Sequence, residues 1–152
     1  MRIALRLAPL AALLAVPATG QDFASGSDIA ARVEAMGKAM KPGQGFAWEP
    51  VVRDGERVAA LEYWKAPGRP AVHPDQAEYA IVIAGEGTLR TGQRMDNGRE
   101  TQPGLIEGDR IVDAVDRPLK PGDVLLIPAG VPHWFGITSD RLVLLGTKIP
   151  AK

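Results

Sequence analysis

The chain contains two histidines, His73 and His133, and each stands beside a turn between two predicted strands. Glu78 follows His73 after a short turn that begins with Pro74. Imidazole nitrogens and carboxylate oxygens are ligands that Zn, Mn, Fe, Ni and Cu accept in proteins. These three side chains are therefore the candidate ligands of a divalent transition metal. A shell of this kind leaves coordination positions open for water, oxygen or substrate.

The five-residue spacing from His73 to Glu78 constrains how the two side chains can meet. On one unbroken strand they would point to opposite faces of the sheet, because successive residues alternate. Pro74 cannot donate a ladder hydrogen bond, so it interrupts the strand at this point. We therefore expect His73 and Glu78 to lie on two neighbouring strands joined by a turn. His133 opens a further strand after the turn 128–132, so all three side chains can point into one cavity.

The elements that hold these residues begin with an N-terminal segment, residues 21–45, that contains one predicted helix. Ser27 is a favourable N-cap, and apolar side chains recur at helical spacing from Ile29 to Met40. This pattern predicts a helix over 28–40, which a Pro-Gly pair then ends. The apolar stripe is expected to pack against the rest of the fold.

Residues 46–152 are predicted to form a single all-β unit. The chain has 17 glycines and 13 prolines, a density of turn residues that favours many short strands over long helices. A hairpin is expected at Asp54-Gly55, a turn at 85–87, and over 92–110 a long connection that can include a hairpin. The predicted strands, with apolar or alternating patterns, are 51–53, 57–65, 79–84, 88–91, 111–115, 124–127, 133–137 and 142–149. Short strands with frequent turns are typical of a sandwich or a barrel.

The segment GDVLLIPAGVPHWFGI resembles a motif of the cupin superfamily, which reads G-x5-P-x-G-x2-H-x3-N. Gly122, Pro128, Gly130 and His133 stand at the motif positions, and Ile137 replaces the final Asn. Four fixed residue types at fixed spacing make this a specific match.

The other cupin motif, which reads G-x5-H-x-H, then three or four residues, then E-x6-G, is half present. Glu78 and Gly85 fit it, and His73 fits the second histidine. Ala71 stands in place of the first histidine and Lys65 in place of the first glycine.

The resemblance covers residues 46–149 and implies a cupin-type β-barrel, that is, a jelly roll or double-stranded β-helix. It implies that the two motifs line one mouth of the barrel and that the protein is a homodimer. It also implies that His73, Glu78 and His133 remain from a set of three histidines and one glutamate. The ligand missing at Ala71 should weaken the affinity for metal.

Two further residues, Gln76 and Phe135, are predicted to line the pocket. Phe135 has the same strand parity as His133 and should face the same interior. Gln76 and Asp75 lie in the turn that follows His73, where either is a candidate to replace the missing ligand in part.

Two classes of function fit these observations. One is a metal-dependent enzyme of the dioxygenase, isomerase or lyase type that acts on a small molecule. The other is a non-catalytic, metal-free module for a sugar or an organic acid, because His and Glu can also simply line a polar pocket. No proton-transfer residue stands out beyond the candidate ligands. Tyr63 and Trp64 are expected in the core or in an interface.

Residues 1–20 have the order of a secretory signal peptide. Two arginines precede the apolar run 7–16, which is too short to span a bilayer, and small residues follow at 18–20. The chain is therefore expected to be exported to the periplasm or secreted, with a mature form that begins near Gln21. An N-terminal anchor that is never cleaved is the alternative.

The charge and the cysteine content exclude several other classes. The formal net charge is +0 and no basic patch is evident, so neither nucleic acid nor a membrane surface is expected as a partner after cleavage of the signal. The chain has no cysteine, which rules out disulfides, thiolate metal ligands and a lipid anchor on cysteine.

Overall fold

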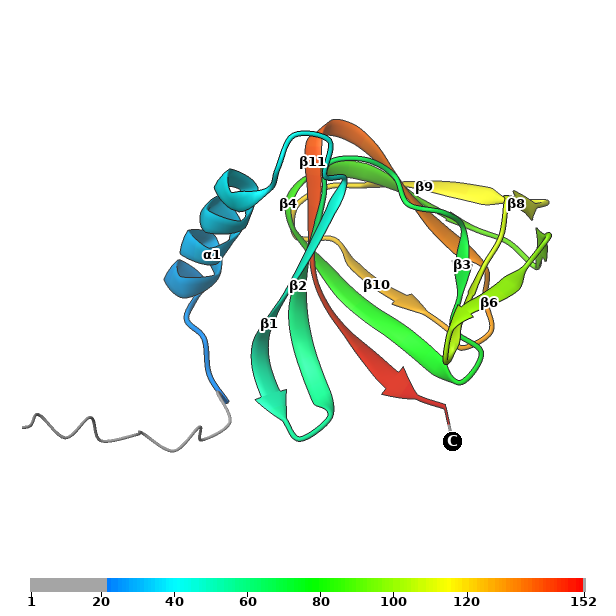
Figure 1. Ribbon diagram of the computed structural model, residues 1–152, viewed down its shortest axis with the longest axis horizontal. Coiled ribbons are helices and arrows are strands. Elements are labelled where there is room, and N and C mark those ends of the chain that lie inside the picture. Colours follow the sequence, from blue (N-terminus) through cyan, green and yellow to red (C-terminus); the bar gives the residue numbers. More distant parts are fainter. Residues whose placement is uncertain (1–21, 152) are drawn as a thin grey trace, which may run out of the picture.

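The computed structural model describes residues 22–151, which form one helix and a strongly curled sheet (Figure 1). Helix α1 spans Gly26–Ala39. The strands of the described residues are, in chain order, β1 Phe46–Asp54, β2 Arg57–Trp64, β3 Ala71–Val72, β4 Gln76–Thr91, β5 Arg94–Asp96, β6 Arg99–Gln102, β7 Leu105–Glu107, β8 Arg110–Val112, β9 Val115–Leu119, β10 Val124–Ile127 and β11 His133–Pro150. The all-β prediction with one short N-terminal helix is confirmed. The predicted signal peptide, residues 1–20, lies outside the described residues.

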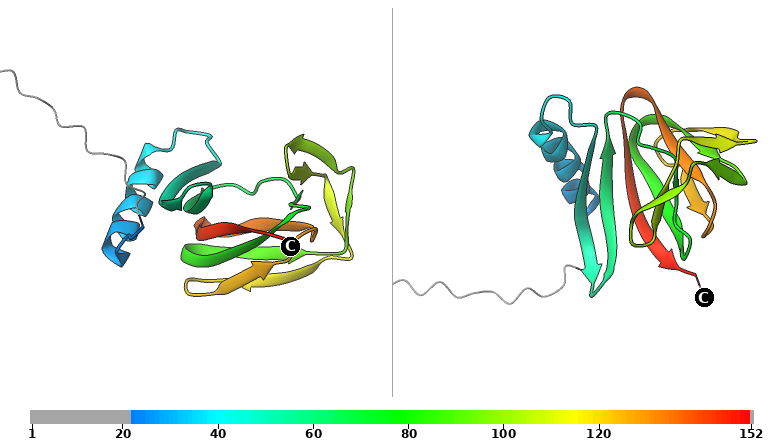
Figure 2. Two further views of the ribbon diagram at one scale, coloured as in Figure 1. Left: turned by 90° about the horizontal axis from the view of Figure 1, so that it is seen from below. Right: turned by 45° about the vertical axis from the view of Figure 1, so that its right-hand side comes forward.

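Strands β4 and β11 are the long elements around which the sheet curls. They pair antiparallel with each other, and β4 also pairs with β9 and β10. The main sheet continues on the other side of β11 through β2 to β1, and through β3 to β7 and β6. Figure 2 shows the sheet closing around an interior, with α1 on the outside and the β5–β8 ribbon at the far end from α1.

Two apolar clusters, one on each face of the sheet, hold this arrangement together. Alternation along β11 supplies both, because Leu142 and Leu144 point inward while Val143 points outward, and all three are completely buried. The inner cluster is Ala80, Val82, Leu89, Leu119, Leu125, Ile127, Phe135, Leu142 and Leu144. The outer cluster, between α1 and the sheet, is Val33, Met36, Met40, Val51, Leu61, Tyr63 and Val143. The predicted packing role of the helix stripe is thus confirmed.

Helix α1 begins two residues earlier than the sequence predicts, and Ser25 rather than Ser27 is the N-cap. The Ser25 hydroxyl accepts a hydrogen bond of 3.1 Å from the Asp28 backbone N–H, and the Asp28 carboxylate accepts one of 3.0 Å from the Ser25 N–H. This capping box satisfies two backbone donors that would otherwise lack partners, which fixes the helix boundary.

The predicted turn at 85–87 is wrong, because β4 runs through it as one strand. Gly85 has a positive φ of 74°, and the register between β4 and β11 shifts between Ile137 and Leu142. The two predicted strands at 133–137 and 142–149 are accordingly one bent strand, β11. An irregularity of this kind bends both strands and helps the sheet to curl.

The predicted strand over 111–115 is also wrong, since Asp113 has a φ of 51° and separates β8 from β9. The segment 92–110, predicted as a long connection that can include a hairpin, contains β5, β6 and β7, and β6 and β7 form such a hairpin. The hairpin expected at Asp54-Gly55 is confirmed by the pairing of β1 with β2.

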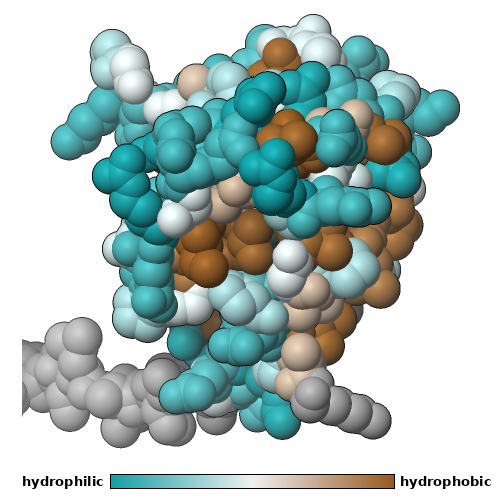
Figure 3. Space-filling model, turned by 90° about the vertical axis from the view of Figure 1, so that its right-hand side faces the viewer, coloured by the Kyte–Doolittle hydropathy of each residue, from teal (hydrophilic) through white to brown (hydrophobic). Residues whose placement is uncertain are grey.

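The side of the molecule that carries β6 and β8 has hydrophilic residues with apolar patches between them (Figure 3). Among residues 22–151, no helix is both long enough and apolar enough to cross a membrane.

Candidate metal centre

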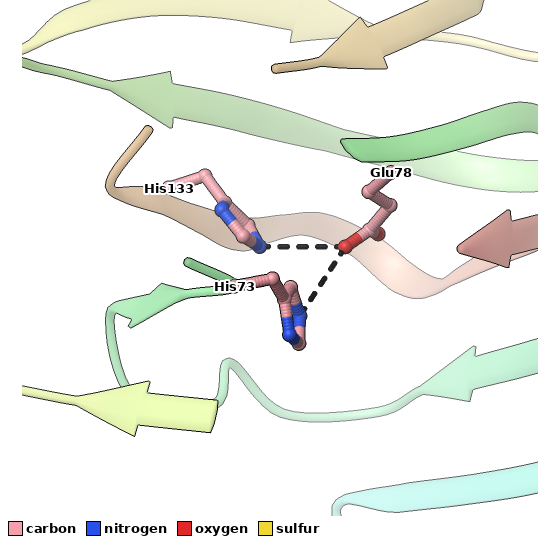
Figure 4. A group of neighbouring side chains, drawn as sticks. All are labelled: His73, Glu78 and His133. Atoms are coloured by element: carbon pink, nitrogen blue, oxygen red, sulfur yellow. Dashed lines mark ion pairs between the residues drawn. The ribbon is translucent and has the colours of Figure 1, made fainter. Parts of the chain in front are cut away.

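His73, Glu78 and His133 meet on the inner face of the sheet (Figure 4). His73 follows β3 directly, Glu78 lies on β4, and His133 is the first residue of β11. Strand β3 pairs with β11 through Ala71 and His133, so the two motif turns lie side by side. The three side chains point toward one another, as the spacing and Pro74 predict.

The distances between the donor atoms suit a shared metal ion. Glu78 Oε2 lies 3.4 Å from His133 Nε2 and 3.7 Å from His73 Nε2, and the three donor atoms lie within 4.8 Å of one another. Ligands that bind a metal at ~2.1 Å in a tetrahedral arrangement are about 3.4 Å apart. An ion would therefore fit between these atoms with little movement of the side chains.

Backbone carbonyls orient both imidazole rings. His133 Nδ1 lies 3.0 Å from the Val131 carbonyl oxygen, and His73 Nδ1 lies 3.4 Å from that of Gly104. A carbonyl only accepts, so Nδ1 carries the hydrogen in each ring and donates it. In the neutral ring Nε2 then presents its lone pair toward the centre, which is the form that binds a metal.

Burial and neighbouring charges favour the ligand forms of Glu78 and His73. Glu78 and His133 are each 4% exposed. Burial favours the protonated form of Glu78, but a hydrogen bond that His133 donates when its ring carries both hydrogens, together with the charge of Lys148, outweighs burial and lowers the pKa of Glu78 to about 2. Burial, helped by the charge of Lys148, lowers the pKa of His73. At neutral pH, Glu78 is thus a carboxylate and His73 is neutral.

Lys148 is a site residue that the sequence reasoning missed. It pairs in register with Glu78 across β11 and β4, and its ammonium forms an ion pair with the same Oε2 atom that the histidines approach. It lies outside both motifs. Strand parity could have found it, because Lys148 has the same parity along β11 as the inward-pointing Leu142 and Leu144.

Glu62 is the second site residue that the sequence reasoning missed, and it is a candidate for the proton-transfer residue that the sequence did not reveal. Its partners in register are Trp48 on β1 and Leu144 on β11, which places its side chain on the inner face. Burial, together with the charge of Glu78, raises the pKa of Glu62 to about 7. A carboxyl group with this pKa can accept or release a proton near neutral pH.

These side chains line one cavity of about 530 Å³. Phe135 lies in its wall, as predicted, and so does Trp64, which was expected in the core or an interface. Gln76 is exposed and is not among the lining residues, and Asp75 is exposed as well and lies outside the group of candidate ligands. The full lining is Phe46, Trp48, Glu62, Trp64, Gly68, Arg69, Ala71, His73, Glu78, Gln102, Leu105, Glu107, His133, Trp134, Phe135 and Lys148.

The family model described as Cupin matches residues 60–151, which include all three candidate ligands and the bent strands that hold them. The chain belongs to the cupin family. No curated protein matches it.

Solved structures share the cupin fold of this chain at low sequence identity. Hydroquinone 1,2-dioxygenase PnpCD, in complex with Cd²⁺ and 4-hydroxybenzonitrile, is 21% identical, with a TM-score of 0.58 over 78% of this chain and 71% of that one. TT1209 from Thermus thermophilus is 18% identical, with a TM-score of 0.52 over 77% and 95%. Oxalate oxidase in complex with the substrate analogue glycolate is 14% identical, with a TM-score of 0.52 over 76% and 57%.

Proposed function

We propose that this cupin binds a divalent transition metal through His73, Glu78 and His133 and acts on a small molecule in the adjoining cavity. The reaction would be of the dioxygenase, isomerase or lyase type. The observation that carries the proposal is the set of three donor atoms at metal-ligand separations in the wall of a cavity of about 530 Å³. A bound divalent ion would supply Lewis acidity to a substrate oxygen.

The protein's own residues have separate tasks in this proposal. The carbonyls of Val131 and Gly104 hold the imidazoles in the orientation that a metal needs. Glu62 is the group that holds or releases a proton, since its pKa is about 7 and it lines the same cavity.

The molecules bound in two of the similar structures support this proposal. The dioxygenase contains Cd²⁺ and an aromatic nitrile, and the oxalate oxidase contains glycolate. Both are cupin-like folds that receive small organic molecules, which is the kind of ligand proposed for this chain.

A metal-free binding module is the second candidate, and the ion pair between Lys148 and Glu78 favours it. The ammonium group already supplies a positive charge to the carboxylate oxygen that a metal would occupy. In that function the pocket would bind an organic acid or a sugar without catalysis.

Metal analysis of the protein purified without an affinity tag separates the two candidates. We expect about one transition-metal ion per chain in the wild type and none in His133→Ala. A wild-type protein that stays metal-free when offered Zn, Mn, Fe and Ni would favour the binding module. In that case Lys148→Met should lower the melting temperature, because the buried carboxylate of Glu78 would lose its ammonium partner.

We also propose that the protein is exported and that it is a homodimer. The order of residues 1–20 supports export to the periplasm or the medium. The exported protein should have the mass of a chain that begins near Gln21, and a full-length mass in the soluble fraction would contradict this. Light scattering of the purified protein tests the dimer, which the family resemblance implies.

A further inference from the structure

Aromatic side chains are scarce in this chain but gather around one cavity. The sequence has three tryptophans, three phenylalanines and two tyrosines. All the tryptophans and two of the phenylalanines line the cavity of the candidate metal centre: Phe46, Trp48, Trp64, Trp134 and Phe135. The aromatic side chains of Trp64 and Phe135 are explained by their packing in the inner cluster. Core packing does not explain the large aromatic side chains of Phe46 and Trp48, which are 39% and 49% exposed.

The strand register places this exposed pair on the inner face of the sheet. Across β1 and β2, Phe46 is opposite Trp64 and Trp48 is opposite Glu62. Because side chains alternate along a strand, all four lie on one face. Strand β1 is at the edge of the sheet, so Phe46 and Trp48 form a side wall of the cavity that is open to solvent.

A series of ring contacts connects this open wall to the candidate ligands. The ring centroids of Phe46 and Trp64 are 4.2 Å apart, and those of Trp64 and Phe135 are 6.2 Å apart. Phe135 lies edge-on to His133 at 6.0 Å, and the two imidazoles are 5.5 Å apart. These separations are close to those of stacked and edge-to-face ring pairs, so the rings form one continuous series, and its exposed members, Phe46 and Trp48, can offer ring surface to a ligand.

The inner end of the wall holds one cation, Lys148, among the acidic side chains Glu62 and Glu78. Lys148 lies there against Glu78, and a metal ion that takes Glu78 as its ligand would remove this partner from the ammonium group. Arg69 lines the cavity too, but its guanidinium binds Asp109 at 2.5 Å. Lys148 together with a bound ion therefore favours an anionic oxygen on the ligand.

We propose that the cavity binds a planar aromatic compound that carries an anionic oxygen. Its ring lies against Phe46, Trp48 and Trp64, and its oxygen points to Lys148 and the candidate metal ligands. The anionic end rests on the metal function proposed above, whereas the aromatic wall does not require a metal.

Binding of benzoate, compared with cyclohexanecarboxylate, tests the aromatic end. Both probes carry one carboxylate on a six-membered ring, but only benzoate has a π face. Isothermal titration of the full chain, both loaded with Mn²⁺ and metal-free, should show about tenfold tighter binding of benzoate. Trp48→Ala should remove most of this preference at unchanged metal content, and Trp48→Phe should keep it. Leu126→Ala, at a position that is 60% exposed and outside the cavity lining, is the matched control and should change nothing.

Each other result has a definite meaning. Equal affinities for the two probes, or no binding of either in both forms of the protein, would overturn the inference, and the metal content would still decide the proposed function separately. A retained benzoate preference in a protein that takes up no metal would keep the aromatic site and defeat the metal function. If Trp48→Ala converts a dimer to a monomer and leaves benzoate binding unchanged, this wall is covered by a second copy and the inference is wrong.

Discussion

The candidate ligands differ from ordinary surface residues in the protonation states that the fold gives them. A histidine must be neutral to bind metal, so we expect the affinity for Zn²⁺ to fall as the pH drops. Burial lowers the pKa of His73, so this ring should take up its proton below roughly pH 6.5, where an ordinary histidine does so. Glu78 contributes nothing to the fall, because its pKa of about 2 keeps it ionised. Titration calorimetry between pH 5 and 8 measures the profile, and a flat one would rule out histidine ligands.

Substitution of the same residues tests which of them bind. His73→Ala and His133→Ala should each weaken metal binding at least 100-fold, because two ligands hold a divalent ion poorly. Asp75→Ala is the matched control, since Asp75 is exposed in the same turn and outside the group of candidate ligands. A comparable loss of metal in Asp75→Ala would mean that this carboxylate completes the shell.

Glu62 should make the metal-free protein less stable as the pH rises. Burial and the charge of Glu78 raise the pKa of Glu62 from 4.5 to about 7, so the folded chain holds this proton more tightly than the unfolded chain. The resulting stabilisation is complete below about pH 4.5 and is lost as the pH passes through about 7. Glu62→Gln should therefore gain roughly 1–2 kcal/mol at pH 8 and little at pH 4.5, after allowance for solvent in the cavity. Thermal unfolding at the two pH values measures this, with Glu56→Gln on the exposed hairpin as control.

At the level of elements, the bend that links β4 to β11 depends on Gly85. Its φ is 74°, and a Cβ there would lie 2.0 Å from the Arg141 carbonyl oxygen. Gly85→Ala should destabilise the fold by roughly 3 kcal/mol or more, from the strained backbone and the clash together. Gly43→Ala is the matched control, with a φ of 80° and nothing within 4 Å of a Cβ, and should cost about 1–2 kcal/mol. Similar losses in urea unfolding for the two variants would contradict a special role of the bend.

The same bend shows what an apolar pattern predicts and what it leaves open. The apolar runs indicated where strands lie, and the parity of Phe135 with His133 correctly indicated its wall position. A glycine between two apolar runs, however, fits a turn and a bulge equally well, because both need a positive φ. Which one forms is decided by the partner strand, and the pairing of β4 with β11 is a contact distant in sequence.

For the whole molecule, motif spacing predicted the barrel and the meeting of His73, Glu78 and His133. It did not predict the rest of the cavity, because Trp48 and Glu62 reach it from β1 and β2, outside the motifs, and Lys148 lies on β11 far beyond the motif that contains His133. Their approach depends on the order β1-β2-β11, which is set by how the sheet curls rather than by any local pattern. Strands β1 and β2 thus contribute the exposed aromatic residues Phe46 and Trp48 and the acid Glu62, and the C-terminal part of β11 contributes the cation Lys148.

A bound metal should stabilise the whole barrel and above all the flap formed by β3, β6 and β7. The flap is held weakly to the rest of the sheet. Strand β3 has two residues and pairs with β11 through a single residue pair. Strand β6 pairs only with β7 in the described chain. His73 follows β3, and its ring meets the Gly104 carbonyl in the β6–β7 turn. A metal shared with Glu78 and His133 would therefore fasten this flap to β4 and β11.

Metal at 100 times its dissociation constant should add about 2.7 kcal/mol to the free energy of unfolding, and raise the melting temperature by roughly 5–10 °C. Hydrogen exchange should slow more in residues 99–107 than in the β1–β2 hairpin, which no candidate ligand touches. Both effects should be absent in His73→Ala. Equal slowing in the flap and the hairpin would mean that the metal stabilises the barrel without fastening the flap, and His73 would then not be a ligand.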